Sequence, residues 1–150
     1  MTPPQLHSDL VRASAKWLSR TPKENIYHGA CSVIIEEGRS LTAEVPDVVG
    51  WSGSTSVVIE CKISRTDFLR DNNKFFRQFP DMGIGNFRYY CVPEKMAQYV
   101  QDRLPENFGL LIAYYSDSDM YLLREVMPSH IVCNYHAERD LLLSLIRKMK

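Results

Sequence analysis

The chain has 150 residues, a length typical of one domain, and we expect residues 1–150 to fold as one unit. With 45% hydrophobic and 24% charged residues, its composition is close to the globular average, which argues against disordered and fibrous proteins. Lys and Arg number 18, as do Asp and Glu, so the formal net charge is zero. This balance excludes a nucleic-acid-binding protein that is strongly basic over its whole surface, but it does not exclude one basic face.

Apolar runs are short, such as residues 57–59 and 110–113, and none approaches the ~18 residues of a membrane-spanning helix. Residues 1–9 are polar and lack the apolar segment of a signal peptide. We therefore expect a cytoplasmic protein with no membrane partner. The four cysteines are widely spaced, so neither a disulfide framework nor a zinc ribbon is expected.

Apolar residues at spacings of three and four predict a helix over residues 4–19. Three strands are expected next, at residues 30–36, 43–51 and 56–63, and the second is interrupted by Pro46. Short connections between these strands favour an antiparallel meander.

The second half of the chain mixes helices with strands. The expected elements are a helix at 65–70 or somewhat beyond, a loop at 79–86, a strand at 87–92, a helix at 93–103, strands at 109–115 and 121–126, and a helix at 138–148. The complete order predicts a mixed α/β (α+β) fold rather than an alternating doubly wound sheet.

The second and third predicted strands contain the candidate catalytic and metal-binding residues. Side chains alternate along a strand, so Glu60 and Lys62 share one face. The other face is wholly apolar and consists of every second residue from Val57 to Ile63. Because the apolar set must face the core, Glu60 and Lys62 point to the opposite side. A hairpin places Asp47, at the end of the second strand, beside them.

Two carboxylates and an ammonium at one end of a sheet suit a hard divalent cation. Mg²⁺ and Mn²⁺ bind through one or two carboxylates together with waters and phosphate oxygens. Such an ion polarises a phosphodiester, and Lys62 would orient or deprotonate the attacking water or stabilise charge in the transition state. The alternative is a weak ion pair between Glu60 and Lys62 on a solvent-exposed face.

The sequence Pro46-Asp47, separated by twelve residues from Glu60-Cys61-Lys62, resembles the motif of the PD-(D/E)XK nuclease superfamily. The restriction-endonuclease-like core of that superfamily is a helix, a three-strand meander, a helix and a strand, the order expected here for residues 4–92; further strands and a C-terminal helix would extend it. The resemblance implies that Asp47, Glu60 and the backbone carbonyl of Cys61 bind the metal. It also implies that Lys62 acts on the attacking water, leaving a 5′-phosphate and a 3′-hydroxyl.

A narrower likeness covers about residues 6–148. The run from Ile63 to Asp71, with the segments 87–93, 104–111 and 138–142, is similar to the MmcB-like DNA repair proteins and to small nucleases of phages and prophages. This resemblance implies a deoxyribonuclease that uses Mg²⁺ or Mn²⁺ in DNA repair or in phage or prophage DNA metabolism. Many relatives dimerise to cut two strands, so a homodimer is one arrangement it implies.

Many relatives carry a glutamate in the first helix that completes the metal site, where this chain has only the shorter Asp9. We expect Asp9 to fill this role, and the alternative is an acid favoured in the first turn by the helix dipole. Glu36 and Glu44 are rival candidates. Glu44 lies an odd number of residues from Asp47 and points to the other face unless Pro46 introduces a bulge.

Charge is uneven along the chain. Residues 62–88 carry six bases against three acids, whereas residues 89–140 carry four bases against eight acids. The basic block follows the Glu-x-Lys strand directly, so a phosphate backbone crossing it would reach the metal. We expect Arg65, Lys74 and Arg77 to contact DNA phosphates.

The sequence therefore predicts a metal-dependent deoxyribonuclease. Two alternatives stay open: a catalytically silent nucleic-acid-binding module on the same fold, and an anti-defence or other protein-interaction domain. The intact set of Asp47, Glu60 and Lys62 favours the enzyme, whereas an incomplete fourth acid favours either alternative. The structure of the DNA substrate, RNA as a substrate, and endo- or exonuclease action also stay open.

Overall fold

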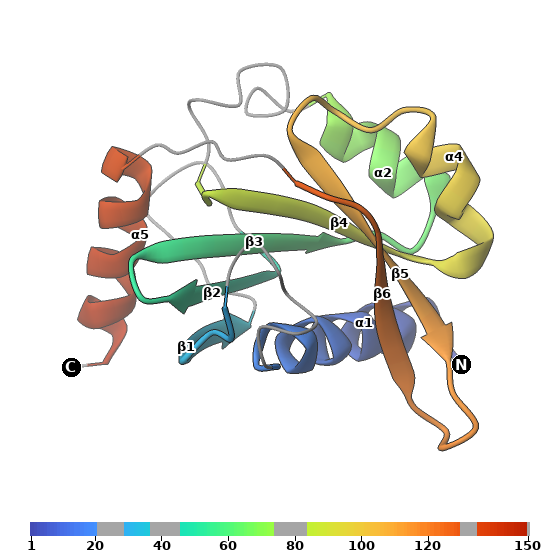
Figure 1. Cartoon of the computed structure of the whole chain (residues 1–150), viewed down its shortest axis with the longest axis horizontal. Helices are drawn as coiled ribbons and strands as arrows, with labels where there is room; N and C mark the ends of the chain where they lie inside the picture. The colour runs from blue at the N-terminus through green and yellow to red at the C-terminus, as the bar shows by residue number, and fades with distance from the viewer. Residues whose placement is uncertain (21–28, 37–45, 74–83, 130–134, 150) are drawn as a thin grey trace.

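A six-stranded sheet forms the middle layer of the computed structural model, which describes residues 1–20, 29–36, 46–73, 84–129 and 135–149 (Figure 1). In chain order the elements are α1 (Pro3–Leu18), β1 (Val33–Glu36), β2 (Val48–Ser52), β3 (Thr55–Cys61), α2 (Arg65–Asn72), β4 (Phe87–Pro93), the short 3₁₀ helix η2 (Glu94–Met96), α4 (Ala97–Gln101), β5 (Phe108–Tyr115), β6 (Tyr121–Met127) and α5 (Tyr135–Lys148). This sequence of helices and strands confirms the predicted mixed α/β class.

The strands lie in the sheet in chain order, from β1 to β6. β1, β2 and β3 pair antiparallel, which confirms the predicted meander. β3 with β4 and β4 with β5 pair parallel, while β5 and β6 form an antiparallel hairpin. Parallel neighbours need a crossover, and α2 and α4 lie on the two crossovers. The carboxyl ends of β3, β4 and β5 therefore meet at one edge of the sheet.

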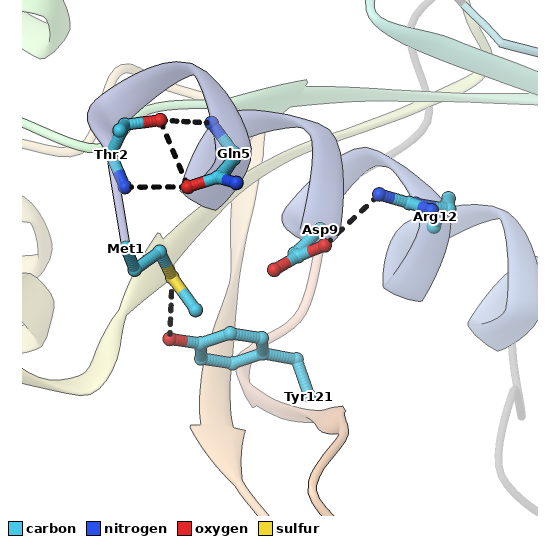
Figure 2. A network of polar contacts seen from close by, with 6 residues as sticks. All are labelled: Met1, Thr2, Gln5, Asp9, Arg12 and Tyr121. Atoms are coloured by element: carbon cyan, nitrogen blue, oxygen red, sulfur yellow. Dashed lines mark hydrogen bonds and ion pairs between the residues drawn. The ribbon is translucent and has the colours of Figure 1, made fainter.

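Helix α1 covers one face of the sheet and begins with a strong cap. The Thr2 side chain accepts a hydrogen bond from the Gln5 backbone N–H at 3.3 Å, and the Gln5 side chain accepts one from the Thr2 backbone N–H at 2.8 Å (Figure 2). Pro3 and Pro4 occupy the first turn, where a missing N–H costs nothing. The apolar stripe of the helix, including Leu10 and Trp17, packs on alternate residues of the central strands.

The opposite face carries the other helices. α2 and α4 pack through Phe68 and Val100 near the carboxyl ends of β3 and β4, where Figure 1 shows them side by side. α5 packs Leu141 near the other end of β3. The buried Glu138 carboxylate fastens α5 to the sheet by accepting hydrogen bonds from the Gly85 N–H, at 2.9 Å, and from the Ser56 hydroxyl.

Several boundaries differ from expectation: β1 begins at Val33 rather than at residue 30, and α5 begins at Tyr135 rather than at residue 138. The predicted helix at 93–103 begins as the 3₁₀ helix η2 after Pro93 and ends at Gln101. Residues 43–45 of the predicted second strand lie outside the described residues, and β2 begins at Val48, after Pro46. The expected loop at 79–86 lies largely outside the described residues. In the segments that the structure describes, no helix has the length and apolar character needed to cross a membrane.

Candidate active site

The candidate site forms at the carboxyl end of β3. Val57, Ile59 and Cys61 pack in the cluster beneath α1, as the strand alternation predicts. Glu60 therefore faces the side that α2 and α4 cover, and its side chain is only 2% exposed. This burial does not fit the alternative of a solvent-exposed ion pair, because such pairs lie on wet surfaces.

Asp47 immediately precedes β2, and extending the antiparallel register by one residue puts it opposite Glu60. Its Oδ2 accepts a hydrogen bond from the Cys61 backbone N–H at 2.8 Å. The carboxylate thus accepts the hydrogen bond that a backbone carbonyl of a neighbouring strand would otherwise accept. The N–H and carbonyl of one strand residue point to the same side. The Cys61 carbonyl is therefore directed to the side of β3 on which Asp47 lies.

His7 of α1 holds the same carboxylate from the other side. Its Nε2 lies 3.5 Å from Asp47 Oδ2. Burial by itself would raise the pKa of Asp47. The hydrogen bonds from His7 and from the Cys61 N–H, with the charges of His7 and Lys62, outweigh burial and lower that pKa below its ordinary value. Asp47 is thus held as a carboxylate.

Lys62 is held as an ammonium by buried acids. Its Nζ lies 3.3 Å from Oδ1 of Asp71, a residue of α2 that is 1% exposed and also accepts a hydrogen bond from the Tyr90 hydroxyl. Burial would lower the pKa of Lys62, but Asp71 first, then Glu60 and Asp47, raise it above its ordinary value. Asp47 lies opposite Glu60 in the extended register, and Lys62 is two residues beyond Glu60, so the three predicted residues lie at the same end of β3.

The structure places Asp9 elsewhere. Its Oδ1 pairs with Arg12 Nη2 at 3.1 Å, and its carboxylate lies near Tyr121 of β6 (Figure 2). Residues two apart on a helix are rotated by about 200° and do not face the same way. His7, rather than Asp9, is therefore the α1 side chain beside Asp47, and the position of Asp9 does not support its expected role as a metal ligand.

No described contact joins the other candidate acids, Glu36 and Glu44, to Asp47. Glu36 ends β1 and lines a small cavity against Val11 and Arg12 of α1. Glu44 lies outside the described residues. The α1 residue that sequence reasoning missed is His7, and its signal was helical spacing: it lies one turn before Leu10 and Val11, which face the sheet.

The donor atoms at this site fit a hard divalent cation. Asp47, Glu60 and the Cys61 carbonyl offer only oxygen, as Mg²⁺ and Mn²⁺ prefer. Within the described ranges, no group of three or more His, Cys, Asp or Glu side chains is close enough to hold a metal. A divalent ion at this site would be held by two carboxylates and a carbonyl of the protein, and water and phosphate oxygens would complete the shell, as is usual for Mg²⁺.

Of the three residues expected to contact phosphate, the structure describes Arg65. It begins α2, is exposed, and holds its guanidinium carbon 4.5 Å from the centre of the Tyr99 ring. Lys74 and Arg77 lie outside the described residues. Arg103, which sequence reasoning missed because it lies in the acidic half of the chain, stacks on the same ring.

Neither a protein-family model nor a curated protein matches this chain. A solved structure with a similar fold is the SPO1766 protein of unknown function from Silicibacter pomeroyi. The two align with a TM-score of 0.63 and 21% sequence identity, over 99% of this chain and 90% of that one. Identity at this level shows a shared fold alone.

Proposed function

We propose that this protein is a Mg²⁺- or Mn²⁺-dependent deoxyribonuclease that hydrolyses phosphodiester bonds in DNA. The observation that carries the proposal is the grouping of the buried Glu60 with the partly buried Asp47 and Lys62 at the end of β3. A group of partly buried charges carries a desolvation cost and is weak evidence of a purely structural role. Here three carboxylates, those of Asp71, Glu60 and Asp47, lie around the single Lys62 ammonium and raise its pKa.

Each side chain has a distinct role in this proposal. A bound divalent cation supplies charge to the phosphodiester and lowers the pKa of a bound water. Asp47, Glu60 and the Cys61 carbonyl hold the ion, and the Lys62 ammonium orients the attacking water and stabilises negative charge on the phosphorane-like transition state. Water oxygen bonds to phosphorus as the bond to the 3′-oxygen breaks, giving a 5′-phosphate and a 3′-hydroxyl. His7 and Asp71 are positioning residues that fix Asp47 and Lys62.

The resemblance to MmcB-like repair proteins and phage nucleases supports a role in DNA repair or in phage or prophage DNA metabolism. A direct test incubates the purified protein with labelled duplex, single-stranded, flap and RNA substrates in Mg²⁺, in Mn²⁺ and in EDTA. We expect cleavage of at least one DNA substrate with either metal and none in EDTA. If the protein cuts no substrate in either metal but binds DNA, the silent binding module replaces the nuclease.

The placement of His7 leads to a prediction with a matched control two residues away on the same helix. His7→Ala should lower the cleavage rate by about 10–100-fold, because residues that orient a metal ligand have effects of this size. Asp9→Ala should leave the rate within about twofold of wild type, since surface substitutions cost little. Cleavage rates at saturating and limiting Mn²⁺ measure both. A larger loss for Asp9→Ala than for His7→Ala would restore Asp9 as the missing acid.

A further inference from the structure

Two arginines from different elements stack on one tyrosine ring. Tyr99 lies in α4, and the guanidinium carbons of Arg65 and Arg103 lie 4.5 Å and 3.8 Å from its ring centre. These distances hold the two carbons within about 8 Å of each other, which is about one Debye length at physiological ionic strength. The sites of the two arginines, α2 and the end of α4, lie side by side in Figure 1.

Among the described residues, the acids nearest in sequence to these two arginines have other partners. Among the residues that the structure describes, neither Arg65 nor Arg103 forms an ion pair. Asp67, the nearest acid in sequence to Arg65, is 3.7 Å from Arg70, and Asp102, next to Arg103, accepts a hydrogen bond from Gln98 at 2.9 Å. Arg103 donates to the Tyr99 carbonyl at 3.0 Å, which fixes one nitrogen and leaves further N–H groups for a ligand.

This cluster is linked to the candidate active site through α2. Arg65 follows Lys62 by three residues, and the Ser64 side chain caps the helix that begins there. The Tyr99 ring lies edge-on to Phe68 of α2 at 6.5 Å, and the same helix supplies Asp71, the partner of Lys62. The arginines therefore lie on the face of the sheet to which Glu60 points.

We infer that Arg65 and Arg103 form a phosphate clamp for the DNA backbone beyond the bond that is cut. The inference rests on the proposed function, because it assigns the ligand as the DNA strand of that site. Guanidinium groups bind phosphate with two parallel hydrogen bonds, which require a fixed plane. The Tyr99 ring supplies that plane to both arginines, so Tyr99 is a positioning residue that reduces the entropy lost on binding.

The test measures binding of a fluorescent DNA duplex at several KCl concentrations in EDTA, so that no hydrolysis interferes. The double variant Arg65→Gln, Arg103→Gln should bind roughly 100-fold more weakly, about tenfold for each lost charged contact. Its salt slope should be shallower by about 1.8, at 0.9 for each duplex phosphate contact. The control Arg124→Gln, Arg147→Gln removes the same charge from exposed positions on β6 and α5 and should change affinity little.

Variants of Tyr99 test whether binding depends on the ordered arrangement of the two arginines or only on their positive charge, because these variants leave the net charge unchanged. Tyr99→Leu should weaken binding severalfold, whereas Tyr99→Phe, which keeps the ring, should bind as wild type. Circular dichroism and thermal unfolding establish that each variant is folded. Equal losses for the two double variants, wild-type affinity in Tyr99→Leu, or no DNA binding by the wild type would each overturn the clamp.

Failure of the clamp and failure of the nuclease give different results. A wild-type protein that binds DNA through these arginines but cuts nothing supports the clamp and contradicts the proposed activity. A protein that cuts DNA equally well after Arg65→Gln and Arg103→Gln supports the activity and overturns the clamp.

Discussion

Replacing Lys62 by methionine is expected to reduce DNA cleavage by about 10²–10³-fold, the usual cost of losing one preorganised group that stabilises transition-state charge. Methionine keeps the length and apolar stem of lysine but removes the ammonium. DNA affinity should change little, because one partly buried ammonium contributes little to an interface with many phosphate contacts. Single-turnover cleavage rates and binding in EDTA measure the two effects separately.

This variant also leaves Asp71 buried without its cation, so a loss of stability could obscure the result. The double variant Lys62→Met, Asp71→Asn removes the uncompensated charge and keeps a hydrogen-bonding partner for Tyr90. We expect it to recover much of the free energy of unfolding and none of the activity. Lys95→Met, at an exposed lysine of η2, is the control and should cleave as wild type. Cleavage by the double variant at the wild-type rate would exclude Lys62 from the chemistry.

The second large effect concerns the packing of β5 between β4 and β6. Gly109→Ala is expected to lower the free energy of unfolding by about 3 kcal/mol, at the upper end of overpacking costs. A Cβ at this position would lie 2.4 Å from Cε1 and 2.6 Å from Cδ1 of Tyr89, and 2.7 Å from the Met127 carbonyl oxygen. Neither the Tyr89 ring nor the Met127 carbonyl can move away easily. The Tyr89 ring is fully buried against Trp17, with centroids 5.6 Å apart, and the carbonyl belongs to the backbone of β6.

Urea denaturation of two glycine variants measures this effect against a control. Gly53 lies in the β2–β3 turn with φ of 60° and no atom within 4 Å of an added Cβ, so Gly53→Ala carries only the backbone strain, about 1–2 kcal/mol. Adding Tyr89→Leu to Gly109→Ala should cost less than the sum of the single variants, since the leucine relieves part of the clash. An unfolding midpoint for Gly109→Ala equal to that of Gly53→Ala would contradict the packing argument.

Local patterns in the sequence determined much of the fold. The alternation along residues 57–63 placed Glu60 on the face away from α1, because side-chain direction in a strand depends only on position along it. Ser64 caps α2 by accepting a hydrogen bond from the Asp67 N–H, a role for which serine is favoured at the start of a helix. The antiparallel meander also followed from short connections, which leave consecutive strands little choice of neighbour.

The parallel pairing of β3, β4 and β5 was not predicted, and tertiary structure decided it. A strand pattern does not reveal its direction relative to a neighbour, whereas helical crossovers force the chain to return in the same direction. That direction gathers the ends of three strands at one edge. The surroundings of Lys62, with Asp71 from α2 and Tyr90 from β4, depend on this arrangement.

Tertiary structure also decided whether His7 or Asp9 lies beside Asp47. Periodicity showed that α1 has an apolar stripe, and the resemblance directed attention to an acid in that helix. Which flank of the helix meets Asp47 depends on how α1 lies across the sheet, a property of packing between distant segments. The sequence by itself determined the strand face and residue types of the candidate site. Only the tertiary structure decided which residues of α1, α2 and α4 surround it, because those contacts join segments far apart along the chain.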